Sequence, residues 1–190
     1  EAGPAELYVL SATTNSSLRP PNNAFTRRYD MPKWEVTARV PLQTAKLDEV
    51  LFGAEPSEAF WGEFLKLDTQ GTEYEILQGA DRTLRERTVA IVSEVSFTEL
   101  YVGQRLFSEM ELFLRERGFS FYGFTALHHR SRKLLDKRLH AGRERALYAD
   151  AVFLKDPLAG GPRLLSLNHR QLHVLFCASL LLGYTDFALE

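Results

Sequence analysis

Three acidic residues lie within eight positions of one another in the segment FLKLDTQGTEYEIL, which spans residues 64–77. Asp68 follows four mostly apolar residues, and Glu73 and Glu75 come just after Gly71. Carboxylates that are held close together can take up a proton, bind a hydroxyl group or hold a cation. This segment is therefore the first candidate for a chemical site.

The elements that must position these acids alternate along the chain. Apolar, β-branched and aromatic segments predict strands at 6–10, 34–40, 64–68, 89–95, 119–124 and 147–154. Helices are predicted at 72–87 and 108–118, the second with a capping box formed by Ser108 and Glu111. Residues 13–25, rich in Asn, Ser and Pro, are expected to form a loop. The alternation predicts an α/β fold with one open sheet, whose last strand runs antiparallel because a long loop precedes it.

The acids are predicted to lie at the edge of the sheet where ligands usually bind. In open α/β sheets, ligands bind beyond the carboxyl ends of the strands. Asp68 is predicted to end its strand at that edge, and Gly71 allows a tight turn and the close approach of a ligand. The alternative is structural, since strand-end aspartates often cap the helix that follows.

The two glutamates of the next helix are predicted to have different roles. Thr72 and Glu75 have capping-box spacing, which gives Glu75 a structural role. Glu73 heads the helical stripe that continues with residues 77, 80 and 84, so it is expected to face inward, near Asp68. A first-turn glutamate is also stabilised by the helix dipole alone, which is the structural alternative for Glu73.

Glu94 is the third candidate acid. It lies near the end of the most apolar predicted strand, in the segment VSEVSF. A buried carboxylate is costly unless it belongs to a site or is paired. The alternative to a site is a salt bridge with Lys66 or a nearby arginine.

Composition sets broader limits. The chain has 190 residues, 45% of them hydrophobic, and a net charge of -2, which excludes a general attraction to nucleic acid or anionic membranes. The single cysteine, Cys177, favours a reducing, cytoplasmic location. The longest apolar run, 174–182, is about half of a membrane span. We expect an α/β domain over 1–158, a helical tail over 159–190, and a chain that is a piece of a longer protein.

Several motifs resemble those of the FkbM-type methyltransferases. The segment LKLDTQGTEYEILQGA (65–80) is similar to the family's hallmark, in which a strand ends in Asp and is followed by Gly, Glu, an aliphatic pair and a second Gly. The segments IVSEVSFTELYVGQ (91–104), YADAVFLKD (148–156), NSSL (15–18) and KLDEVL (46–51) resemble further family segments and occur in the expected order.

The resemblance implies an S-adenosylmethionine-dependent O-methyltransferase that acts on a hydroxyl of a small molecule or sugar. It implies a Rossmann-like sheet with an antiparallel last strand. A carboxylate within reach of the acceptor hydroxyl can serve as the base. Asp68 and Glu73 are the candidates for this base, and Glu94 is a candidate supporting or acceptor-binding residue. Ser16, Ser17, Gln70 and Gly71 are candidates for acceptor binding.

One departure from the family pattern leaves a rival hypothesis open. The family's Gly-rich turn, which cradles the cofactor, has no counterpart in these 190 residues. We therefore expect the sheet to be incomplete and the chain by itself to bind S-adenosylmethionine weakly. The rival hypothesis is a catalytically inactive, methyltransferase-like binding or scaffolding module.

The remaining features favour simpler interpretations. Residues 128–145 hold seven Lys and Arg and two acids, which indicates either a solvated loop or a clamp for an anionic acceptor; nucleic-acid binding is not favoured, because aromatic residues are not interleaved. His169 and His173 have metal-binding spacing, but no metal site is predicted because no further ligand is near. The apolar C-terminal helix is expected to pack on the domain or to form a homo-oligomer.

Overall fold

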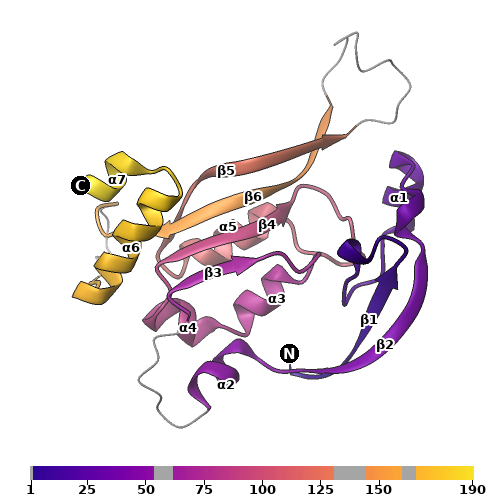
Figure 1. The fold of residues 1–190 in the computed structure, drawn as a ribbon, viewed down its shortest axis with the longest axis horizontal. Helices are drawn as coiled ribbons and strands as arrows, with labels where there is room; N and C mark the ends of the chain where they lie inside the picture. Colours follow the sequence, from indigo (N-terminus) through magenta and orange to yellow (C-terminus); the bar gives the residue numbers. More distant parts are fainter. Residues whose placement is uncertain (1, 54–61, 131–143, 160–165) are drawn as a thin grey trace.

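The computed structural model describes residues 2–53, 62–130, 144–159 and 166–190. Its centre is a four-stranded sheet in the order β3-β4-β6-β5, made of β3 (Phe64–Leu67), β4 (Ala90–Ser96), β6 (Arg145–Lys155) and β5 (Phe119–Arg130) (Figure 1). β3 and β4 are parallel, and β6 is antiparallel to both of its neighbours. The prediction that the segments 64–68, 89–95, 119–124 and 147–154 form one sheet with an antiparallel last strand is confirmed, whereas the predicted strands at 6–10 and 34–40 lie outside this sheet.

β4 is the most buried strand because it lies between two layers of helices. All seven of its residues are buried. Side chains alternate between the faces of a strand, so Ile91 and Val95 pack toward one face and Ala90 and Val92 toward the other. The first face is covered by α3 (Glu73–Gln78), α4 (Asp81–Glu86) and α5 (Phe107–Arg115). The second is covered by α6 (His169–Leu181) and α7 (Thr185–Leu189).

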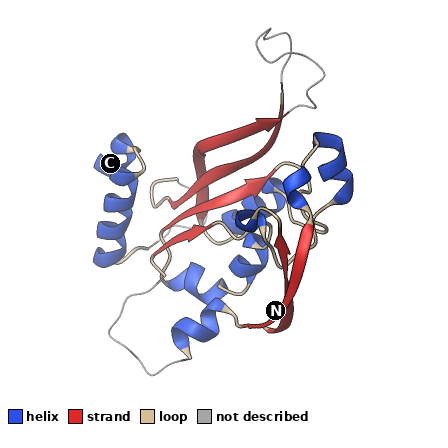
Figure 2. Cartoon of the chain, turned by 45° about the vertical axis from the view of Figure 1, so that its right-hand side comes forward, coloured by secondary structure: helices blue, strands red, loops and turns tan. Residues whose placement is uncertain are grey.

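The N-terminal strands form a separate unit. β1 (Gly3–Leu10) and β2 (Val36–Thr44) pair antiparallel in a two-stranded sheet of their own. In Figure 2 these two strands lie at the lower right, beside the N mark, and the helices at the C mark lie at the left. The connection between the two strands contains η1 (Thr13–Asn15), α1 (Asn23–Tyr29) and η2 (Pro32–Trp34), so the loop predicted at 13–25 is only partly a loop. α1 forms because Asn22 Oδ1 accepts hydrogen bonds from the N–H groups of Ala24 and Phe25.

The helix predicted over 72–87 is instead two helices, α3 and α4, which meet at Gly79 and Ala80. A residue outside this segment stabilises the break between the two helices. Asp48, in α2 (Leu47–Phe52), accepts hydrogen bonds at 2.9 Å from the N–H groups of both Arg82 and Thr83. The carbonyl of Gly79 accepts the N–H of Asp48. Asp48 thus caps the N-terminus of α4 and fixes the point where the helical path changes.

The predicted capping box at the start of α5 is also wrong. The helix begins at Phe107, and Glu109 Oε2 accepts the N–H of Leu106 at 3.0 Å. Glu111 pairs with Arg115, one helical turn later. The helix starts one residue earlier than expected because the acid that satisfies its free N–H is Glu109.

The C-terminal helices pack through one face only. Leu175 and Ala178 of α6 are buried against Val92 and Val152 of the sheet. The outward side of α6 keeps Phe176 and other apolar residues exposed. Within the described residues, no helix has the length and apolar character needed to cross a bilayer.

Candidate active site

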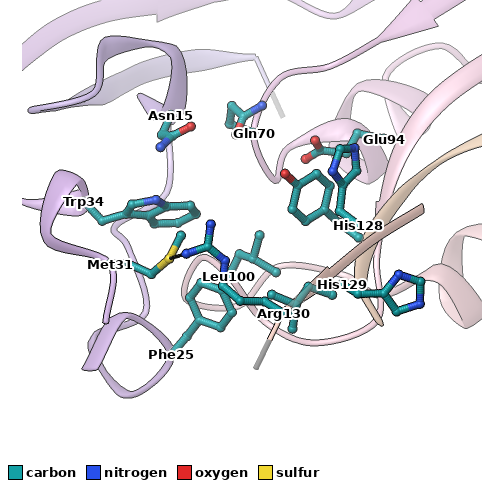
Figure 3. A pocket seen from close by; sticks show the side chains of 12 residues that line it. Asn15, Phe25, Met31, Trp34, Gln70, Glu94, Leu100, His128, His129 and Arg130 are labelled. Atoms are coloured by element: carbon teal, nitrogen blue, oxygen red, sulfur yellow. Dashed lines mark hydrogen bonds between the residues drawn. The ribbon is translucent and has the colours of Figure 1, made fainter. Parts of the chain in front are cut away.

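A pocket of about 260 Å³ lies at the carboxyl end of β4, between the sheet and the connection that joins β1 to β2 (Figure 3). One wall is apolar and comes from Phe25, Met31, Trp34, Leu100 and Leu147. The polar lining residues are Asn15, Gln70, Glu94, His128, His129, Arg130 and Tyr148. Segments far apart in the sequence therefore meet around a single cavity.

Glu94 reaches this pocket because of strand periodicity. It follows Ala90 and Val92 on one face of β4, at the point where α6 no longer covers that face. Its side chain is 9% exposed. Within the described part of the chain, no hydrogen bond or ion pair engages its carboxylate. The alternative, a salt bridge with Lys66, is not formed, because Lys66 Nζ lies 2.8 Å from Asp150 Oδ1 instead.

The surroundings of Glu94 disfavour its charged form. Burial raises the pKa of Glu94 to about 8, and the nearby charges of Glu73, Asp68 and Asp150 contribute in the same direction. A carboxyl group with such a pKa exchanges its proton near neutral pH. That property suits a group that accepts a proton during a reaction.

Glu73 is buried as expected, with 3% exposure, but its carboxylate is used by the protein itself. It accepts the N–H of Thr69 at 2.7 Å, the hydroxyl of Thr69 at 3.1 Å and the N–H of Gly71 at 3.0 Å. Burial raises the pKa of Glu73, and these donors oppose the rise. Glu73 therefore holds the turn after β3 in shape and has little capacity left for a substrate.

Asp68 and Gln70 link this turn to the pocket. Asp68 follows the last residue of β3 and is exposed, and its Oδ1 accepts a hydrogen bond from Gln70 Nε2 at 2.8 Å. Gln70 Oε1 accepts a hydrogen bond from the Tyr101 hydroxyl at 3.0 Å, and Gln70 lines the pocket. Gln70 has a positive φ of 58°, an uncommon conformation for a residue other than glycine. The two hydrogen bonds, one at each atom of the amide, hold the Gln70 side chain at the edge of the pocket.

Gly71 does not provide room for a ligand. A Cβ atom at this position would lie 2.9 Å from the Tyr101 ring and 3.3 Å from the side chain of Gln104. Its φ of +100° also favours glycine. The expectation that Gly71 faces a ligand is corrected, since the space next to it is filled by the protein's own side chains.

The two predicted serines form hydrogen bonds with backbone groups next to the pocket. Ser16 Oγ accepts the N–H of Leu10 at 3.1 Å, and the Ser17 hydroxyl donates to the carbonyl of Gln70 at 2.6 Å. Neither serine lines the pocket, whereas their neighbour Asn15 does. Ser17 therefore positions Gln70, and direct binding of a ligand is not supported for either hydroxyl.

Glu75 has the structural role that was predicted, through a different partner. Its Oε1 lies 2.6 Å from an Nη atom of Arg19. Thr72 makes no side-chain cap, because its hydroxyl donates to Thr69 Oγ1 at 3.0 Å. The predicted capping box of Thr72 and Glu75 is wrong, and Glu75 instead ties α3 to the connection between β1 and β2.

Comparison with protein-family models gives a match to the Methyltransferase FkbM domain over residues 3–121, which is more than half of the chain. This chain belongs to the FkbM methyltransferase family. No curated protein and no solved structure matches it. The mixed sheet agrees with the α/β architecture expected of a methyltransferase.

The match divides the pocket of this FkbM-family chain into two parts. Residues 3–121 include the apolar wall formed by Phe25 and Trp34, and the polar residues Gln70 and Glu94. The wall built by β5 and β6 lies beyond the matched range. The family match therefore covers the first part of the pocket and does not extend to the second wall.

Sequence reasoning missed most of this second wall. His128 stacks on Tyr148 with ring centroids 4.3 Å apart and an angle of 13° between the rings. Arg130 donates to the sulfur of Met31 at 3.0 Å. The basic segment 128–145 was singled out, but residues 131–143 lie outside the described part of the chain. The strand predicted at 119–124 in fact continues to Arg130, and this extension places the first three residues of the segment on the sheet.

Proposed function

We propose that the chain carries the acceptor side of an S-adenosylmethionine-dependent O-methyltransferase that acts on a hydroxyl of a small molecule or sugar. The observation that supports this function best is Glu94, a buried carboxyl group that no described residue pairs with, in a pocket at the carboxyl end of the central strand. Family membership supplies the reaction class.

The chemistry required of the chain is limited. An acceptor hydroxyl must lose its proton as its oxygen gains the methyl group, and a carboxylate within hydrogen-bond reach can take that proton. Glu94 is the proposed base. Gln70 and Asn15 supply amide groups that orient the acceptor, and the Trp34 wall excludes water from one side of the pocket.

Glu73 and Asp68 receive supporting roles in this proposal. Glu73 shapes the turn that carries Gln70. Asp68 holds the amide of Gln70, and its charge helps to keep the pKa of Glu94 high. Asp68 is thus a positioning residue that acts through its neighbours.

The residues present fit the acceptor better than the whole cofactor. S-adenosylmethionine, when bound, supplies an activated methyl group. The described residues offer no Gly-rich strand-to-helix turn, and the turn at Gly71 is filled by Tyr101 and Gln104. No described residue of this chain is therefore assigned to binding of the cofactor.

The test is a methyl-transfer assay on the full-length protein that follows S-adenosylhomocysteine formation in the presence of hydroxylated acceptors, at pH values on both sides of 8. The rate is expected to rise with pH and to level off above about 8, because the ionised form of Glu94 is the base. Asp68→Asn should shift this rise to lower pH, since it removes a charge that raises the pKa of Glu94. Acceptor binding by the full-length protein without turnover under all these conditions would favour the inactive binding module.

A further inference from the structure

The pocket contains one carboxyl group and one guanidinium that do not pair with each other. Glu94 is the sole carboxyl group among the described lining residues, and Arg130 lines the same cavity. Figure 3 shows the guanidinium of Arg130 beside Met31 and Trp34, on the other side of the view from Glu94. A ligand in the pocket can therefore meet a different chemical group at each end.

Arg130 has few protein partners for its five N–H donors. Among the described residues, its side chain donates to the thioether of Met31, a weak acceptor, at 3.0 Å. Within the described residues, no carboxylate lies within ion-pair distance of it. Arg145 lies directly opposite Arg130 in the register of β5 and β6. Like charges that face each other across a sheet repel, and a bound anion would relieve this repulsion.

The wall between the two ends suits the face of a ring. Trp34 is 7% exposed and is held in place by Tyr101, at 5.0 Å between ring centroids, and by Phe25, at 5.7 Å. Leu100 and Leu147 complete this apolar surface. A rigid aromatic platform of this kind packs against the apolar face of a sugar or another ring.

We propose that the acceptor is an anionic hydroxy compound of the sugar-acid or sugar-phosphate class. Its anionic group binds Arg130, its ring packs against Trp34, and its free hydroxyl lies at Glu94. Guanidinium groups bind carboxylates and phosphates through paired, charge-assisted hydrogen bonds, which makes Arg130 the specificity-determining residue. The role of the hydroxyl rests on the proposed function, whereas the recognition of the anion does not.

Calorimetric titration with glucose, glucuronate and glucose 6-phosphate tests the anion directly, because the three differ only at the sixth carbon. The two anions are expected to bind more tightly than glucose, and raising the salt concentration should weaken only their binding. Arg130→Gln should reduce their affinity by roughly tenfold to a hundredfold and leave glucose unchanged. Glucuronate and glucose 6-phosphate separate a carboxylate site from a phosphate site.

Arg39→Gln is the matched control, since Arg39 is an exposed arginine on β2 that pairs with Glu6 outside the pocket. Equal losses in the two variants, equal affinity for all three sugars, or no binding of any of them at millimolar concentration would overturn the proposal. Anion selectivity that depends on Arg130 in a protein without methyl transfer would retain this inference and reject the proposed function. Turnover without a preference for the anions would reject this inference and retain the proposed function.

Discussion

The turn after β3 and the pocket-facing end of β4 each contain a buried glutamate, and their surroundings differ. Around Glu73, two backbone N–H groups and one hydroxyl donate to the carboxylate. Around Glu94, no described residue donates to the carboxylate, and three nearby acids raise its pKa further. Burial is thus shared by both residues, and the number of donors distinguishes a structural acid from one available for chemistry.

The comparison predicts that the largest effect on turnover comes from Glu94. Glu94→Gln is expected to lower the rate of methyl transfer by about 10²–10⁴-fold, because the amide keeps the size of the side chain and cannot accept the proton. Steady-state assays of S-adenosylhomocysteine formation by the full-length protein measure the loss. Glu99→Gln is the control, since Glu99 is an exposed acid five residues further along. If the two variants were equally active, Glu94 would not be the base.

Glu94→Gln should also stabilise the fold at alkaline pH. The folded pKa of Glu94, about 8, lies above its ordinary value of 4.5, so the folded protein binds more protons than the unfolded chain between these values. Stability of the wild type therefore falls as pH rises through this window, and Gln is free of that cost. We expect the free energy of unfolding of Glu94→Gln to exceed that of the wild type by on the order of 2–4 kcal/mol above pH 8, and the difference to disappear below the ordinary pKa of a glutamate. Chemical unfolding of both proteins at several pH values tests this, and a gain independent of pH would contradict it.

Glu73→Gln should instead destabilise the protein. The amide loses charge-assisted bonds from Thr69 and Gly71 and brings an NH2 group toward backbone donors. The free energy of unfolding is expected to fall by about 1–3 kcal/mol, which thermal melting can detect. Any fall in turnover should follow the fall in stability and the displacement of Gln70. A variant that melts normally and has no activity would return Glu73 to the role of base.

The smallest effect is expected for Glu75→Gln. Glu75 pairs with Arg19 in a partly exposed ion pair, and Gln can still accept one hydrogen bond. The loss of stability should stay below about 1 kcal/mol, with turnover close to that of the wild type. Melting and activity measured beside Glu73→Gln provide the comparison. A larger loss for Glu75→Gln than for Glu73→Gln would reverse the order proposed for the two acids.

Local sequence patterns predicted the strands better than the helices. β4 could be predicted because a short, β-branched and apolar run suits only a strand covered on both faces. The division of 72–87 into two helices could not, because the break depends on Asp48, which lies more than 20 positions upstream. The start of α5 was missed by one residue because two glutamates compete for the capping position.

The site was predictable in part for similar reasons. Glu94 stood out as an acid in an apolar strand, and Gln70 lay within a recognisable motif. The wall formed by Trp34, Tyr148 and Arg130 depends on how three distant segments pack together and on the register of β5 and β6. No short-range pattern encodes those contacts.

The connection between β1 and β2 also has a consequence for the order of folding. It is fastened by bonds from Ser17 to Gln70, from Arg19 to Glu75 and from Tyr101 to Asn15, which span 53, 56 and 86 positions of the chain. Closing such long loops costs entropy before any contact repays it, so these bonds should form after the sheet has assembled. Substitutions at Ser17 or Arg19 should then accelerate unfolding and barely slow folding, as stopped-flow kinetics in denaturant can measure. The pocket would be the last part of the domain to form and the first to open.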